Sequence, residues 1–192
     1  MLRTSLALMT LVATLAGAAE VRDVRVVRDG DQFEIRMQAG IDAAPAAVFQ
    51  ALQDFGAMPQ YNHDLRDVRV VPTGRPGQVR LFTVIHTCVL FFCKTMRQEQ
   101  IMTATANAGG GVLQADLVPQ GSDFKQGEGR WEIYPCPDGR PPACLDLHLT
   151  LTPSFWVPPL LGPWIIRIKM EDEARRTSDG LERLARAATG GR

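Results

Sequence analysis

The feature that most constrains this chain is a long helical pattern near its C-terminus. Acids precede bases by four residues along it, as in Glu171–Arg175 and Asp172–Arg176, which favours an α-helix with a charged outer side. Pro163 suits the first turn of such a helix. Apolar or small side chains recur three or four residues apart and mark one face of it: Ile166, Met170, Ala174, Thr177, Leu181, Leu184 and Ala188. We expect this face to close a curved β-sheet.

The first two turns of this helix are apolar nearly all round, because they carry Trp164, Ile165, Ile166 and Ile168. A helix end of this kind is buried on two sides, touches a ligand or touches a membrane. We expect it to face a cavity. Ordinary core packing is the alternative.

Residues 1–19 predict a secretory signal peptide. Arg3 gives a positive charge, residues 6–15 form an apolar run, and residues 16–19 offer small side chains for cleavage. The run is too short for a convincing membrane span. We therefore expect a single mature domain, residues 20–192, exported to the periplasm of a Gram-negative bacterium.

Export favours disulfide bonds for the four cysteines, because an even number of them would lie in an oxidising compartment. Four cysteines allow three pairings, and close spacing favours Cys88–Cys93 with Cys136–Cys144. Each pair would close a short loop and contribute about 2–3 kcal/mol to stability. Neither spacing is Cys-x-x-Cys and no His pair accompanies them, so the sequence predicts no metal site and no cofactor.

Strands with one short helix fill the middle of the chain. Asp29-Gly30 predicts a hairpin between strands at 21–27 and 33–39, and a short helix then begins at Pro45 and ends at Gly56. Turn residues separate several of the further strands that alternation and β-rich composition predict: 67–71, 78–87, 93–104, 112–118, 127–134 and 144–152. Strands bounded by helices in this order predict an α+β fold with an antiparallel sheet.

Three stretches resemble the START-like helix-grip superfamily, in its polyketide cyclase/dehydrase and coenzyme Q-binding branch. They are the strand-to-helix passage at 41–55, the connector at 55–61 with a Pro near an aromatic, and the Pro-rich approach to the C-terminal helix. Order and length match over about residues 23–188. The resemblance implies a curved sheet of about six to seven strands wrapped around the long C-terminal helix. It also implies an apolar tunnel for a lipid, such as an isoprenoid quinone, a fatty acyl lipid or a polycyclic lipid.

Our main hypothesis is an exported carrier without enzymatic activity that binds one hydrophobic molecule. His86 or Tyr61 would orient the polar head of the ligand. The side chains expected around the ligand come from the connector, two strands and the start of the C-terminal helix: Phe55, Tyr61, Phe82, Val84, His86, Trp131, Ile133, Trp164, Ile165 and Ile168.

The family also contains cyclases and dehydratases, so an enzyme is the second hypothesis. His86 with a carboxylate, Glu99 or Asp116, would then act as an acid/base pair. His148 is expected to point outward, because the leucine face of its strand is the better candidate for burial. The sequence has no nucleophile elbow, phosphate-binding glycine loop or zinc-protease motif, so we assign no catalytic residue.

Two apolar loops suggest a surface that touches a membrane transiently around a portal. They carry Val89, Leu90, Phe91 and Phe92 between two cysteines, and Phe155 with Trp156. A docking module with a filled core is the third hypothesis. Nucleic acid is not an expected partner, because acids and bases balance at 21 each and no basic run is present.

Overall fold

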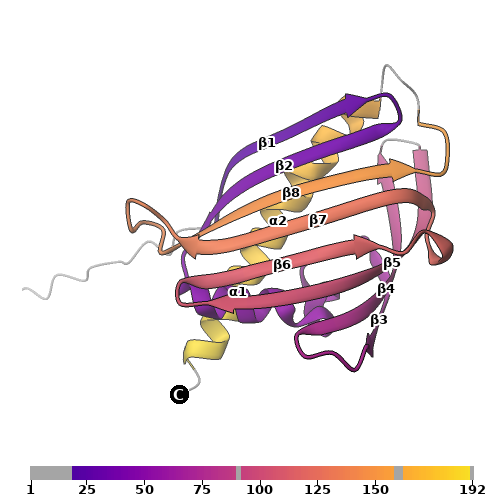
Figure 1. Ribbon diagram of the computed structural model, residues 1–192. Helices are drawn as coiled ribbons and strands as arrows, with labels where there is room; N and C mark the ends of the chain where they lie inside the picture. Colours follow the sequence, from indigo (N-terminus) through magenta and orange to yellow (C-terminus); the bar gives the residue numbers. More distant parts are fainter. Residues whose placement is uncertain (1–18, 90–91, 158–161, 191–192) are drawn as a thin grey trace, which may run out of the picture.

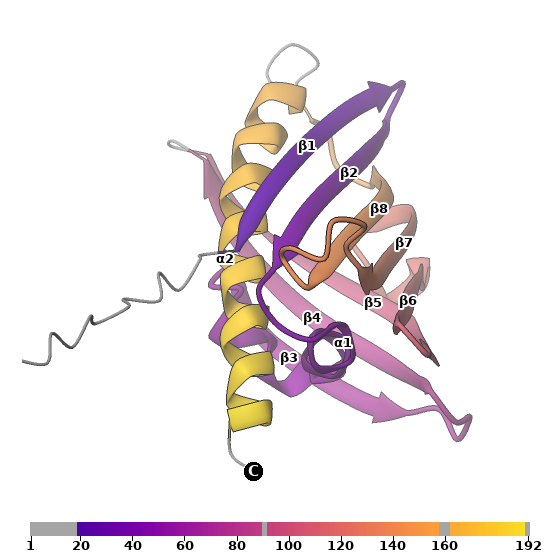
Figure 2. The ribbon, with the colours of Figure 1, turned by 90° about the vertical axis from the view of Figure 1, so that its left-hand side faces the viewer.

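A computed structural model describes residues 19–89, 92–157 and 162–190. One antiparallel sheet curves around a long C-terminal helix (Figures 1 and 2). The order across the sheet is β1-β2-β8-β7-β6-β5-β4-β3, so β1 and β3 are its edges. Its eight strands exceed the six to seven that the resemblance implied: β1 Glu20–Asp29, β2 Gln32–Ile41, β3 Leu65–Pro72, β4 Gln78–Val89, β5 Phe92–Asn107, β6 Gly110–Leu117, β7 Phe124–Pro135 and β8 Ala143–Pro153.

The helices lie between β2 and β3, between β6 and β7, and after β8. They are α1 Pro45–Gln53, the 3₁₀ turns η1 Phe55–Gln60 and η2 Pro119–Gly121, and α2 Gly162–Gly190. Proline opens α1 at its first turn, where a missing N–H costs nothing. The expected end of this helix at Gly56 is wrong, because α1 stops at Gln53 and Gly56 lies inside η1. No described helix is both long and apolar enough to cross a bilayer.

The N-terminal hairpin joins the sheet through the last strand. The β2–β8 ladder runs from Phe33 opposite Leu151 to Ile41 opposite Ala143. Gly30 makes the β1–β2 turn with a φ of 57°, a backbone conformation that suits glycine. This pairing extends the curved sheet over a core that includes Ile41 and Leu145, both fully buried.

Helix α2 packs closely against the segment after η1 at Gly180. A Cβ atom there would overlap the Cβ and ring of Tyr61, which follows η1. A Cβ atom at Gly111 on β6 would likewise overlap the ring of Phe49 on α1. Two glycines therefore set the spacing of the two helices from their neighbours.

Both of the favoured cysteine pairings are present. Cys88–Cys93 joins the ends of β4 and β5, and Cys136–Cys144 joins the chain just after β7 to the start of β8. Each bond therefore lies within one hairpin.

Candidate ligand-binding cavity

A cavity of about 230 Å³ lies between the sheet and α2. Its walls are mainly aliphatic and aromatic, with Met37, Leu81 and Leu147 from the sheet and Met170 and Leu181 from α2. Small-molecule sites are concave and mostly apolar, with few polar groups. The space is where the helix-grip resemblance implied it.

Three of the expected ligand-binding residues line this cavity: Phe55, Tyr61 and Trp131. The Trp131 ring lies over Gly129, where a Cβ would come within 2.8 Å of the ring. Burial raises the pKa of the Tyr61 hydroxyl, and the carboxylate of Asp54 raises it further. Ile133, on the same strand as Trp131, is fully buried in the core and is not part of the cavity wall.

The expected face of β4 is the opposite of the one that lines the cavity. Leu81, Thr83 and Ile85 point inward. The face with Phe82, Val84 and His86 points away from it, and the guanidinium of Arg69 lies 4.5 Å from the centre of the Phe82 ring. Both faces of this strand carry apolar side chains, so alternation could not identify the inner one.

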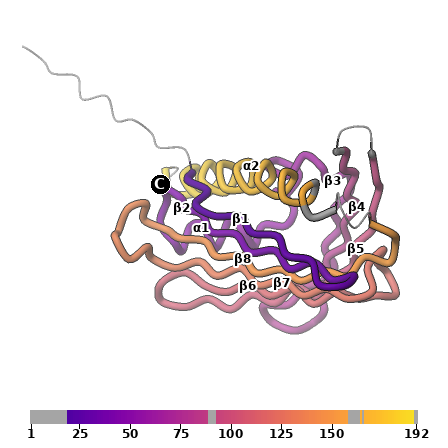
Figure 3. The backbone as a smooth tube through the Cα atoms, turned by 90° about the horizontal axis from the view of Figure 1, so that it is seen from above, coloured from indigo at the N-terminus to yellow at the C-terminus, as the bar shows by residue number. Residues whose placement is uncertain are grey.

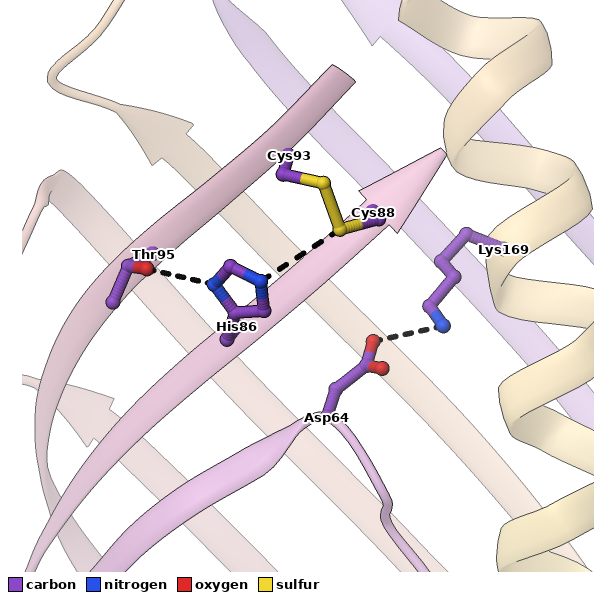
Figure 4. The surroundings of a disulfide bond; sticks show 6 residues. All are labelled: Asp64, His86, Cys88, Cys93, Thr95 and Lys169. Atoms are coloured by element: carbon purple, nitrogen blue, oxygen red, sulfur yellow. Dashed lines mark hydrogen bonds and ion pairs between the residues drawn. A yellow bond between two sulfur atoms is a disulfide. The ribbon is translucent and has the colours of Figure 1, made fainter. Parts of the chain in front are cut away.

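His86 therefore lies outside the cavity, beside the Cys88–Cys93 disulfide (Figure 4). Its Nδ1 atom is 2.8 Å from Oγ1 of Thr95, and its Nε2 atom is 3.7 Å from Sγ of Cys88. The hypothetical partner Glu99 pairs instead with Arg80, at 3.1 Å. The acid/base pair considered for an enzyme is not assembled by these contacts.

His148 is exposed and points outward, as expected, with Nε2 at 2.9 Å from Oε1 of Glu34. His63 is also exposed. Neither histidine lines the cavity.

The start of α2 is further from the cavity than expected. Trp164 and Ile168 are 55% and 44% exposed, and neither lines the wall. The side chain of Ile165 lies outside the described residues. The cavity instead meets α2 one to four turns further on, at a face that includes Ala174 and Thr177.

Most of the lining residues are not among those expected from the sequence, and Glu173 is the acidic one. It sits three residues after Met170 and four before Thr177, so it shares their face of α2. Burial raises the pKa of its carboxyl to about 7, with a further contribution from the negative charge of Asp64. Within the described part of the chain, its Oε1 atom is buried without a hydrogen-bond partner. The helical spacing places Glu173 on this face, but a charged residue on an apolar face is not an expected member of a cavity wall.

Asp64 and Lys169 form an ion pair between the chain just before β3 and α2, with Oδ2 and Nζ 2.8 Å apart (Figure 4). Both side chains are largely buried, at 20% and 19% exposed. Burial would raise the pKa of Asp64, but hydrogen bonds from Lys169 and Thr87 and the positive charges of Lys169 and Arg176 together outweigh this, and the net shift is downward. The pair ties α2 to the β3 edge of the sheet, opposite the β1 edge that α2 packs against.

Solved structures with the same architecture come from bacteria and from animals. A STAR-related lipid transfer protein from Xanthomonas axonopodis aligns over 86% of this chain and 99% of its own, with a TM-score of 0.66 at 14% identity. The Zhui aromatase/cyclase from Streptomyces aligns over 81% and 94%, with a TM-score of 0.61 at 10% identity. Human STARD10 aligns over 84% and 72%, with a TM-score of 0.56 at 8% identity. At these identities the likeness establishes the fold.

The sequence itself carries a family signal. A search of curated protein sequences found no match. The sequence profile of one family, described as polyketide cyclase/dehydrase and lipid transport, matches residues 32–189. This match spans the sheet from β2 onward and nearly all of α2, which supply most of the cavity wall. The chain therefore belongs to the polyketide cyclase/dehydrase and lipid transport family, and it has the START-like helix-grip fold.

Proposed function

We propose that this protein is an exported carrier that binds one hydrophobic molecule between the sheet and α2. The observation that carries the proposal is the apolar cavity, whose walls come from all eight strands of the described sheet, from α1 and η1, and from α2. Burying a ligand there gains about 25 cal/mol for each Å² of apolar surface, before the ordering costs of binding. Lipid transport is among the activities in the family's description.

Export is the second part of the proposal. Residues 1–19 have the composition of a signal peptide, and residues 20–192 would form the mature periplasmic domain. Two disulfides support an oxidising compartment, because such bonds persist outside the reducing cytosol.

We further propose that the protein touches a membrane surface while it loads or releases its ligand. The ammonium of Lys94, near the start of β5, lies 4.6 Å from the centre of the Phe155 ring, so the start of β5 and the segment that carries Phe155 are neighbours. Trp156 is 75% exposed. The side chains of residues 89–92 lie outside the described residues. Figure 3 shows the ends of β4 and β8 and the start of α2 at one end of the molecule.

The binding proposal is tested by mass spectrometry of protein purified from its host under native conditions. We expect a bound lipid-sized mass that organic extraction removes. Thr177→Trp places an indole in the cavity and should abolish this mass, whereas Arg175→Trp places the same group on the exposed side of α2 and should retain it. Equal occupancy in both variants, with unchanged circular dichroism, would contradict the cavity as the binding site.

An enzyme of the cyclase/dehydratase type is the second candidate, and Glu173 is the observation that favours it. A carboxyl group whose pKa lies near 7 in an apolar site has the property of a general acid or base. Turnover of a polyketide-like substrate that is lost in Glu173→Gln would select this candidate over the carrier. Recovery of an unmodified lipid after repeated cycles of binding and release would select the carrier.

A further inference from the structure

Two polar atoms without partners lie in the cavity wall. Oε1 of Glu173 comes from α2 and Oγ1 of Thr83 from β4, on the sheet side. Neither atom has a hydrogen-bond partner among the residues that the structure describes. Thr83 is 5% exposed, so bulk water does not hydrate its hydroxyl group freely. Leaving a buried polar group unpaired costs about 1–3 kcal/mol, which a bound ligand with the right polar group would recover.

The chemistry of the two side chains restricts that polar group. A hydroxyl group on the ligand donates its proton to the Glu173 carboxylate and accepts one from the Thr83 hydroxyl. A carboxylate on the ligand has no proton to donate and would lie close to the charge of Glu173 when that side chain is ionised. Lys169 does not compensate for this, because its ammonium is already paired with Asp64 at 2.8 Å.

We propose that Glu173 and Thr83 bind the hydroxyl group of an uncharged alcohol or phenol whose apolar body fills the cavity, and that the same pair discriminates against fatty acid anions. This inference rests on the carrier function proposed above and gives it a ligand class. Apolar walls supply affinity for any hydrophobic molecule. Asn62, Gln98 and Gln100 add further polar side chains to the wall, but Glu173 and Thr83 carry its buried atoms without partners among the described residues, so these two gain most from a matching head group.

The charges around Glu173 support this discrimination. Asp64 from the chain before β3 and Asp172 from α2 raise the pKa of Glu173, while Lys169 and Arg176 from α2 lower it. Burial dominates, and the pKa lies near 7. At about pH 8 the group is therefore mostly an anion in a desolvated site, which repels a second anion strongly.

A matched pair of ligands tests the proposal directly. The uncharged fluorescent probe N-phenyl-1-naphthylamine is bound to the mature protein and displaced with 1-decanol or with decanoate at about pH 8, where decanoate is ionised. We expect 1-decanol to compete at least about tenfold more strongly, equivalent to about 1.4 kcal/mol. Equal competition by the two ligands would overturn the head-group assignment.

Three variants identify the residues responsible. Glu173→Gln removes the charge and keeps a hydrogen-bonding group, so the preference for 1-decanol should fall at least fivefold, through tighter decanoate binding. Thr83→Val keeps the shape and removes the hydroxyl, so 1-decanol should bind several-fold more weakly while the probe binds as before. Glu171→Gln is the control, because Glu171 pairs with Arg167 on the outer side of α2.

The outcomes separate this inference from the proposed function. An unchanged preference in Glu173→Gln, with the probe still bound, would refute the head-group site and leave the carrier function standing. Failure of the wild-type protein to bind the probe and 1-decanol would overturn both. Thermal melting of each variant checks that the fold is retained.

Discussion

At the scale of single residues, Glu173 makes stability depend on pH. Its pKa lies near 7 in the folded protein, against 4.5 for an ordinary glutamate side chain, so the unfolded chain loses this proton first as the pH rises. The free energy of unfolding should therefore fall between about pH 4.5 and pH 7. The expected loss is on the order of 2 kcal/mol, after discounting for the partial accessibility of the side chain.

Urea unfolding of wild type and Glu173→Gln at about pH 5 and pH 8 measures this effect. The free energy of unfolding of the variant should fall much less between these two pH values than that of wild type. The variant should therefore be the more stable protein at the higher pH. Asp64 does not interfere, because its pKa is lowered and its stabilising contribution is lost only in more acidic solution. The same pH dependence in both proteins would show that the carboxyl is not held in an apolar site.

Single residues are also what the sequence predicts least well, because it does not determine which face of a strand lines the cavity. Phe55, Tyr61 and Trp131 line the cavity, and their role in binding a ligand stays a prediction. Strand β4 was placed with the wrong face inward, since Phe82 and Leu81 are equally apolar and only the completed sheet distinguishes them. His86 lies on the same outer face as Phe82 and is therefore not part of the cavity wall.

At the scale of elements, the packing of α2 depends on Gly180. Alanine is normally favoured over glycine in a helix interior by about 1 kcal/mol. Here a methyl group would overlap Tyr61, so Gly180→Ala should instead destabilise the protein by about 1–3 kcal/mol. The helix would be pushed away from η1 at the wall of the cavity.

Chemical unfolding of Gly180→Ala beside Gly190→Ala checks this expectation. Gly190 lies at the end of the same helix, and a Cβ there meets nothing within 4 Å. Its substitution should leave the free energy of unfolding nearly unchanged. Stabilisation by Gly180→Ala would mean that α2 packs less closely on Tyr61 than described.

Elements were easier to predict than their contacts. The periodicity that marks α2 and the alternation in β2 and β8 are local properties, and the structure has these elements close to the expected ranges. The boundary at Gly56 was wrong because Asp54 accepts a hydrogen bond from the Ala57 amide and begins a 3₁₀ turn there. The contact between Tyr61 and Gly180 joins segments far apart in sequence, so no local pattern predicts it.

At the scale of the whole molecule, exposed tryptophans gather near the start of α2. Trp156 and Trp164 are 75% and 55% exposed. If this end meets a membrane, Trp156→Ala with Trp164→Ala should slow transfer of a lipid from vesicles about fivefold, which corresponds to roughly 1 kcal/mol of lost apolar contact. Affinity for a ligand supplied in solution should not change, because neither side chain lines the cavity.

Stopped-flow transfer of a fluorescent lipid from vesicles to the protein measures this rate. Val70→Ala is the matched control, since Val70 is an exposed apolar residue on β3, away from the β4–β5 hairpin end. Equal rates in all three proteins would exclude this surface from the transfer step.

The two disulfides have a mechanical consequence. Each one fastens a strand to its own hairpin partner, and neither fastens α2 to anything. The helix is thus joined to the sheet covalently only by the chain that follows β8, and elsewhere by packing and by ion pairs such as Asp64–Lys169. The cysteine bonds therefore stiffen two hairpins of the sheet and leave the position of α2 against it to noncovalent contacts alone.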